Sequence, residues 1–275
     1  MSSELLRVVE GHPGGQMRCG EAGAPPGSMQ GGRVLDPAAV GQALRQLVAR
    51  SEITTSRALI AAGDAVASYR VISFPLSATE ADVDAAVRIQ LDLGSNKMAH
   101  RHFEVPAAAA SERAVFAAVW DRPQVKAIAE AIRLAGLEPA VVDLKSLCVA
   151  RALTRDSCLF VDLTSAPAEV LLIDQYVPRV WHAFSAAMDG DLPRSIFEAL
   201  QPVLGFSRRA GGAGFGPGSP ILVRADPPVT SGVVTRLEEL TGRSVLPVEP
   251  PPRIDPAVRF VPYLTCLGLM LRRSG

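Results

Sequence analysis

The chain has 275 residues, its 28 Lys+Arg balance 28 Asp+Glu, and 48% of its residues are hydrophobic. This composition is too apolar for a disordered chain, and zero net charge gives no general attraction to a phosphate backbone, which argues against a nucleic-acid partner. No apolar run reaches the roughly 18 residues of a membrane span. The N-terminal residues lack the basic-then-apolar pattern of a secretory signal. We therefore expect a cytoplasmic protein.

The first half of the chain predicts alternating strands and helices. A strand is expected at Leu5–Glu10, and a Gly- and Pro-rich irregular segment at 11–33. Asp36 then caps a helix that has Pro37 at its first position. A capping box at Ser77–Glu80 begins a second helix, which runs to about Leu93. The other expected elements are strands at Arg57–Ala62, Ala67–Phe74, His102–Pro106, Ala114–Trp120 and Pro139–Leu144, and helices from Asp121 to Gly136 and over Ser146–Leu153.

The second half opens with three expected strands and ends with a helix over Ala257–Arg273. A Gly-rich connector at 210–220 and a Pro-rich linker at 247–256 interrupt it. The mixed pattern predicts an α/β protein with two lobes, which we place at 1–153 and 154–275. The remaining expected strands are Cys158–Leu163, Ala168–Asp174, Val177–Phe184, Ile221–Ala225 and Ser244–Pro247, with helices over about Leu192–Arg208 and Pro228–Thr241.

Motifs that carry chemistry are scarce. The four cysteines form no CxxC pair, which favours reduced thiols, and the chain has neither a phosphate-binding P-loop nor a GxSxG nucleophile elbow. His100 and His102 can share one face of a strand, but no nearby cluster supplies the further ligands that a metal needs. We interpret both histidines as surface residues and predict no metal site.

One segment is more suggestive. Asp162 lies at the end of an apolar strand and is followed by the hydroxyl residues Thr164 and Ser165 at a turn. An Asp there can hold a metal-bound water, and the turn can face a phosphate. The alternative is a strand-end Asp that accepts hydrogen bonds from its own turn. The pattern alone leaves both interpretations open.

The order of segments resembles the PilM family of actin-like type IV pilus assembly proteins, and through it the FtsA/Hsp70-type ATPase superfamily. The resemblance extends over nearly the whole chain, and no single motif is decisive. It implies an actin-like, ribonuclease H-like fold of two lobes, with a small α/β subdomain inserted at about 56–143 and a reduced helical subdomain in the second lobe. The stretches that carry it are Ala58–Gly63, Ser68–Pro75, Ser77–Leu91, Ala114–Trp120, Ala135–Leu137, Val141–Asp143, Phe160–Ser165 with the hairpin through Pro178-Arg179, Gly242–Pro247 and Leu267–Arg272.

The departures from the family pattern concern the nucleotide site. The strand that carries the first phosphate motif is absent ahead of Ser2-Ser3, although a start upstream of Met1 would restore it. The second motif keeps Asp162 but has Thr164 in place of the glycine that lets backbone approach phosphate. The adenosine motif is replaced by Leu222–Pro228, where Pro227 and Pro228 have no amide to donate. The resemblance thus leaves Asp162, Thr164 and Ser165 as a degenerate phosphate motif, and we predict no ATP hydrolysis and no cofactor.

In the family, the inserted subdomain helps to form a groove for the short cytoplasmic segment of PilN, an inner-membrane protein. The resemblance therefore implies a non-catalytic scaffold that docks a PilN-like partner, with the pilus secretion ATPase as a further candidate partner. It would reach the membrane only indirectly, through partners. The strand edges and the helices at 78–93 and 122–135 are the regional candidates for docking. Two alternatives stay open: an actin-fold nucleotide-binding ATPase or kinase that uses Asp162, and an unrelated α/β binding module.

Overall fold

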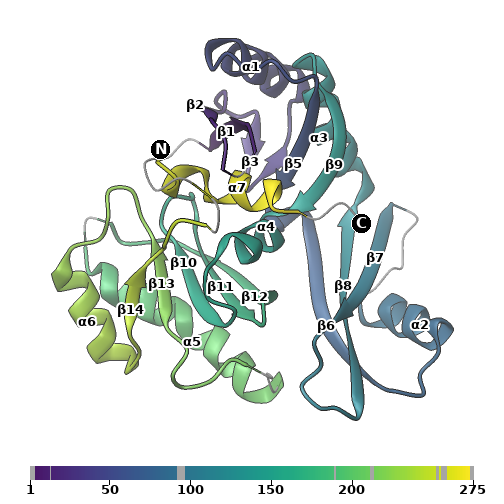
Figure 1. Ribbon diagram of the computed structural model, residues 1–275, viewed down its shortest axis with the longest axis vertical. Coiled ribbons are helices and arrows are strands. Elements are labelled where there is room, and N and C mark those ends of the chain that lie inside the picture. The colour runs from purple at the N-terminus through teal and green to yellow at the C-terminus, as the bar shows by residue number, and fades with distance from the viewer. Residues whose placement is uncertain are drawn as a thin grey trace.

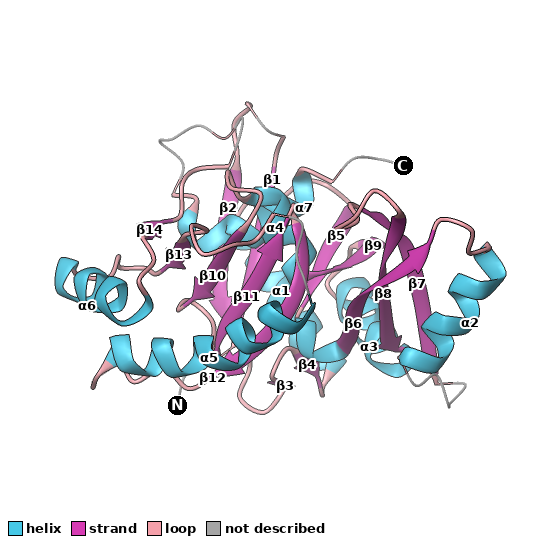
Figure 2. Cartoon of the chain, turned by 90° about the horizontal axis from the view of Figure 1, so that it is seen from below, coloured by secondary structure: helices cyan, strands magenta, loops and turns pink. Residues whose placement is uncertain are grey.

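The computed structural model describes residues 4–12, 14–91, 97–188, 190–210, 214–251, 254 and 259–272. They form two lobes and a smaller sheet (Figure 1), and the view in Figure 2 places α6 and α2 at opposite ends of the molecule. Among the helices so described, none is both long and apolar enough to cross a membrane.

The second lobe is built on a five-stranded sheet in the order β12-β11-β10-β13-β14. Its central strand β10 runs antiparallel to β11 and parallel to β13. All five residues of β10 are buried, because helices cover both faces of the sheet: α5 and α6 on one, α4 and α7 on the other. The bounds are β10 Cys158–Asp162, β11 Ala168–Asp174, β12 Val177–Phe184, β13 Ile221–Arg224, β14 Val245–Pro247, α4 Lys145–Ala152, α5 Leu192–Ala210, α6 Ser231–Thr241 and α7 Leu264–Met270.

The first lobe contains two separate pairs of six- or seven-residue strands, besides one short pair. β1 (Leu5–Glu10) pairs antiparallel with β2 (Arg18–Gly23), and β5 (Arg57–Ala62) pairs parallel with β9 (Glu138–Leu144). Both pairs pack on the same helices, because β1, β5, α1 and α3 contribute to one hydrophobic cluster. The bounds are α1 Pro37–Arg50 and α3 Arg122–Leu134, with short strands β3 Met29–Gln30 and β4 Arg33–Val34 and a single 3-10 turn at Asp64–Val66.

A three-stranded antiparallel sheet, β6-β8-β7, lies between β5 and α3 in the chain. α2 covers one face, where Val83 and Val87 pack against Val115 and its neighbours on β8. The opposite face carries Phe116 and Tyr69. The bounds are β6 Ala67–Pro75, α2 Glu80–Gln90, β7 Met98–Val105 and β8 Glu112–Asp121.

The structure corrects three predictions. The segment 11–33 is not wholly irregular, because β2 pairs along β1 despite a polar, Gly-containing sequence that favours no strand by itself. The capping box of α2 joins Thr79 and Asp82, not Ser77 and Glu80. The closing helix is much shorter than predicted: it begins at Leu264, directly after a 3-10 turn that contains Pro262, and the expected start at 257 lies outside the described residues.

Candidate functional site

All three predicted site residues come together at the carboxyl end of β10. The Thr164 amide and hydroxyl donate to Oδ1 of Asp162 at 2.9 and 2.7 Å. The Ser165 hydroxyl donates to Oδ2 at 3.1 Å. The amide and hydroxyl donors of this turn therefore point toward the buried carboxylate of Asp162. This is the arrangement expected of an Asp that ends a strand and accepts hydrogen bonds from the turn that follows it.

Lys145, the first residue of α4, adds a cation that the sequence analysis missed. Its Nζ lies 3.0 Å from Oδ2 of Asp162 and 2.5 Å from both Oε2 of Glu169 and Oγ of Ser165. A positive charge at a helix N-terminus opposes the helix dipole. That mismatch was the available signal that Lys145 has an acidic partner elsewhere.

Arg224, at the end of β13, is the second missed cation. It is 1% exposed, and its Nη1 lies 3.0 Å from Oδ2 of Asp162. Its Nε and Nη2 donate to the carbonyl oxygens of Val261 and Pro262, each at 2.7 Å. A charged residue that ends a buried apolar strand needs such partners, because an unpaired buried charge costs several kcal/mol.

These side chains form a charge-balanced cluster, which we call the Asp162 network: Asp162 and Glu169 against Lys145 and Arg224. Burial by itself would raise the pKa of Asp162, but the guanidinium of Arg224 and the ammonium of Lys145 lower it below its ordinary value. Burial likewise opposes the charge of Lys145, yet Asp162 and Glu169 raise its pKa. All four groups are therefore neutralised by the protein itself.

The Asp162 network does not fit a phosphate or its Mg²⁺. Both Asp162 oxygens already accept hydrogen bonds from protein donors. The amides of Leu163 and Thr164 are directed to the Arg224 carbonyl and to Asp162, and Pro167 has no amide. A phosphate cradle requires backbone N–H groups that point outward at the ligand.

A second buried carboxylate lies beside the network. Asp64 accepts hydrogen bonds from the Ser146 hydroxyl at 2.6 Å and from its amide at 3.0 Å. Burial raises the pKa of Asp64 to about 7, and the bond from Ser146 offsets only part of that rise. Lys145 and Ser146 are consecutive, so the first turn of α4 contacts one acid from each lobe.

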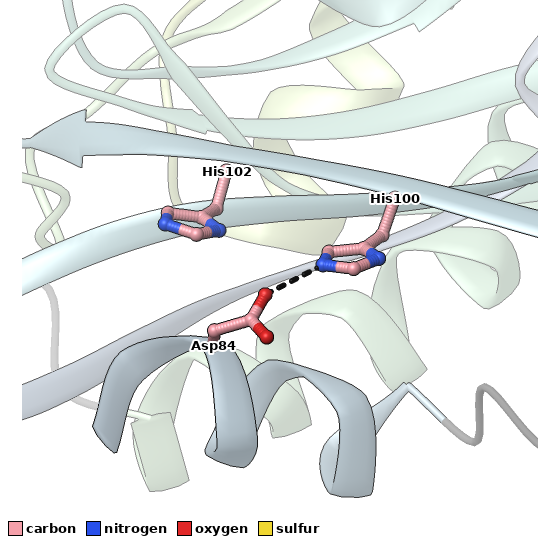
Figure 3. A group of neighbouring side chains, drawn as sticks. All are labelled: Asp84, His100 and His102. Atoms are coloured by element: carbon pink, nitrogen blue, oxygen red, sulfur yellow. Dashed lines mark hydrogen bonds and ion pairs between the residues drawn. The ribbon is translucent and has the colours of Figure 1, made fainter. Parts of the chain in front are cut away.

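The structure places a third polar side chain, which the sequence pattern did not predict, beside His100 and His102. Asp84 of α2 faces His100 and His102 of β7, with ligand atoms within 4.8 Å of one another (Figure 3). His100 Nε2 lies 2.9 Å from Asp84, whose other oxygen accepts from Arg88 at 2.7 Å. The bonds from Arg88 and then His100 lower the pKa of Asp84 to about 2. Because the Arg88 cation already neutralises Asp84, we interpret the group as a polar link between α2 and β7.

A cavity of about 650 Å³ lies next to the Asp162 network. One side of its wall includes Lys145, Thr164, Ser165 and Glu169. The rest is formed mainly by β1, β5 and α7, and residues of α1 and α3 also line it. The Asp162 network therefore faces the strands of the first lobe across this cavity.

No known family model and no curated protein matches the sequence. Among solved structures, the chain is similar to one described as the PilM-PilN type IV pilus biogenesis complex: 19% identity, TM-score 0.71, covering 98% of this chain and 96% of that one. It is also similar to the ethanolamine utilization protein EutJ from Carboxydothermus hydrogenoformans: 12% identity, TM-score 0.51, covering 98% and 86%. The predicted actin-like, two-lobed α/β fold is confirmed, and the chain shares its fold with the structure described as the PilM-PilN complex.

Proposed function

We propose that the protein is a non-catalytic assembly protein of a type IV pilus or a related secretion machine. In this proposal it is cytoplasmic and is held at the inner membrane by docking the cytoplasmic segment of a PilN-like protein. The fold shared with a chain of the PilM-PilN type IV pilus biogenesis complex supports the class of role. The observation that carries the non-catalytic part is the Asp162 network, in which protein cations neutralise the one surviving phosphate-motif carboxylate.

Our candidate docking surface is the β7 edge of the β6-β8-β7 sheet around Phe103, on the face opposite α2. Further along this face, Phe116 is buried in a cluster with Val177 of β12. Phe103 on β7 stacks on Phe116 with ring centroids 5.1 Å apart, and Phe116 stacks on Tyr69 at 5.2 Å. Phe103 is nevertheless 44% exposed. β7 is an outer strand of its sheet in the part of the chain that the structure describes. An aromatic side chain beside an open strand edge suits an extended peptide with an apolar anchor.

Peptide binding tests the docking proposal. A synthetic peptide with the cytoplasmic N-terminal sequence of the PilN-like protein from the same genome is labelled and titrated by fluorescence anisotropy. We expect Phe103→Ala to weaken binding about tenfold or more, because buried aromatic anchors dominate such interfaces. Ile89→Ala is the matched control, since Ile89 is 81% exposed on α2 and belongs to the other side of the sheet. Absence of binding, or an equal effect of both variants, contradicts the proposal.

Calorimetric titration with ATP and Mg²⁺ tests the non-catalytic part separately. We expect no binding heat at micromolar nucleotide, because Lys145 and Arg224, the cations of the Asp162 network, are already paired with protein carboxylates. Micromolar binding that disappears in Asp162→Ala would show instead an actin-fold nucleotide binder.

A further inference from the structure

Two histidines of β7 meet two acids of α2 on the face of the sheet that this helix covers. His100 and His102 are two residues apart on β7, so both side chains lie on the same face of the strand. Glu80 and Asp84 are four residues apart on α2, so both lie on the same face of the helix. The packing of the helix on the sheet joins the pairs: His100 lies 2.9 Å from Asp84, and His102 lies 3.6 Å from Glu80.

Three of these side chains converge closely enough to share one metal ion. A ring nitrogen of each histidine and a carboxylate oxygen of Asp84 lie within 4.8 Å of one another, and Figure 3 shows both rings pointing from β7 toward Asp84. Tetrahedral zinc, with bonds of about 2.0–2.2 Å, keeps its ligand atoms roughly 3.4 Å apart. The three groups need to approach by no more than roughly 1.5 Å. All three side chains keep some exposure to solvent, which gives an ion access.

The neighbouring guanidinium groups leave room for a cation. Arg88 bonds Oδ2 of Asp84, which leaves Oδ1 facing the histidines. The Arg88 side chain is 60% exposed, and exposed ion pairs of this kind hold their partners weakly. Arg113 pairs with both Glu80 and Glu104. Three carboxylates therefore surround two guanidinium groups, and the excess negative charge favours a divalent cation.

We propose that Asp84, His100 and His102 form a binding site for a divalent transition-metal ion, with Zn²⁺ as the best-suited ion. Imidazole and carboxylate are ligands that Zn²⁺ accepts, whereas Mg²⁺ and Ca²⁺ take oxygen ligands. The sequence offered only the two histidines, and the fold adds the acid from α2. Without metal, the same side chains make the polar link between α2 and β7 described above. Bound Zn²⁺ takes over that link.

The metal site and the candidate docking surface lie on opposite faces of β7. Phe103 follows His102 in the strand, so its side chain points to the other face, where it stacks on Phe116. Zinc therefore holds β7 from the side of α2 and leaves the aromatic side free. Metal binding neither needs nor blocks the proposed peptide.

Zinc affinity tests the site directly. Tag-free, fully reduced protein competes with a chromophoric chelator for Zn²⁺, and we expect micromolar or tighter binding. His100→Ala and His102→Ala should each weaken it more than about tenfold, since loss of even a second-shell partner costs 10–100-fold. His182→Ala is the matched control, because His182 lies on β12 in the second lobe. Excess Mg²⁺ should not displace the zinc. Absence of micromolar binding, or binding that survives both histidine variants, overturns the assignment.

Amide hydrogen exchange tests whether the metal joins the two elements. Free Zn²⁺ at about ten times Kd should slow exchange in α2 and β7 roughly tenfold relative to EDTA, with α5 unchanged. His100→Asn keeps a side-chain donor toward Asp84 but no imidazole. It should keep the Tm of the metal-free protein and lose the effect of zinc, which separates metal binding from folding. Equal exchange in Zn²⁺ and EDTA contradicts the proposal. Neither measurement involves a nucleotide or the partner peptide, so the metal site and the proposed function stand or fail independently.

Discussion

At the residue scale, Lys145 is the group on which the Asp162 network depends. It contacts both Asp162 and Glu169, and its removal leaves Asp162 with Arg224 alone and takes away the ion pair of Glu169. We expect Lys145→Met to lower the free energy of unfolding by about 3–5 kcal/mol, the usual cost of breaking a buried pair by removing one partner. Urea unfolding measures this, with Lys126→Met on the exposed face of α3 as the matched control.

The double variant Lys145→Met with Glu169→Gln distinguishes the loss of charge pairing from the loss of side-chain packing at Lys145. It should recover part of the lost stability, because one uncompensated carboxylate is removed with the cation. A single-variant loss below about 1 kcal/mol, or a double variant no more stable than the single one, contradicts the charge argument.

The raised pKa of Asp64 predicts that the stability of the protein depends on pH. Its pKa is raised to about 7 in the folded protein, so the folded state binds a proton more tightly than the unfolded state does. Stability from this group is therefore fully present below the unfolded pKa and is lost as pH rises toward 7. We expect a loss of about 2–3 kcal/mol between pH 5 and pH 8. Asp64→Asn, which keeps an acceptor for Ser146, should flatten that slope in urea unfolding series, and an unchanged slope would exclude Asp64 as its source.

The sequence predicted the acid of the site but not its partners. Asp162, Thr164 and Ser165 are adjacent in the chain, so a local pattern brings them together. Lys145, Glu169 and Arg224 reach them from three other elements, which only the folded topology places side by side. Of the two interpretations that the pattern left open, the hydrogen bonds of the turn match the strand-end Asp.

At the element scale, the packing of α7 on α4 depends on one glycine. A Cβ at Gly268 would lie 1.8 Å from the carbonyl oxygen of Cys148, so the helices approach with no room for a side chain. We expect Gly268→Ala to destabilise by about 2 kcal/mol or more. Gly232→Ala on α6, where the added Cβ would meet only Oγ1 of Thr230 at 4.0 Å, should instead stabilise by about 0.5–1 kcal/mol through helix propensity. Thermal unfolding of both variants measures the contrast, and similar Tm values for the two would contradict it.

Elements with strong local signals were predictable, whereas those that depend on a neighbour were not. Asp36 caps α1 as predicted, and its carboxylate accepts from two backbone amides. β2 has no such signal, because its polar sequence becomes a strand only through β1 and the ion pairs Arg7–Glu21 and Arg18–Glu10. The boundaries of the lobes at 153 and of the insertion at 56 and 143 stay predictions.

At the scale of the whole molecule, α4 joins the lobes. Lys145 bonds to Asp162 in the second lobe, and Ser146 bonds to Asp64 in the first. We expect a single calorimetric unfolding transition, because this turn bonds to both lobes. Lys145→Met should broaden or split the transition, and two resolved transitions in the unmodified protein would contradict the coupling.

The same helix turn has a consequence for the angle between the lobes. Two neighbouring side chains of α4, Lys145 and Ser146, bond to acids of different lobes. We therefore expect the protein's own contacts to set the angle between the lobes when the chain folds.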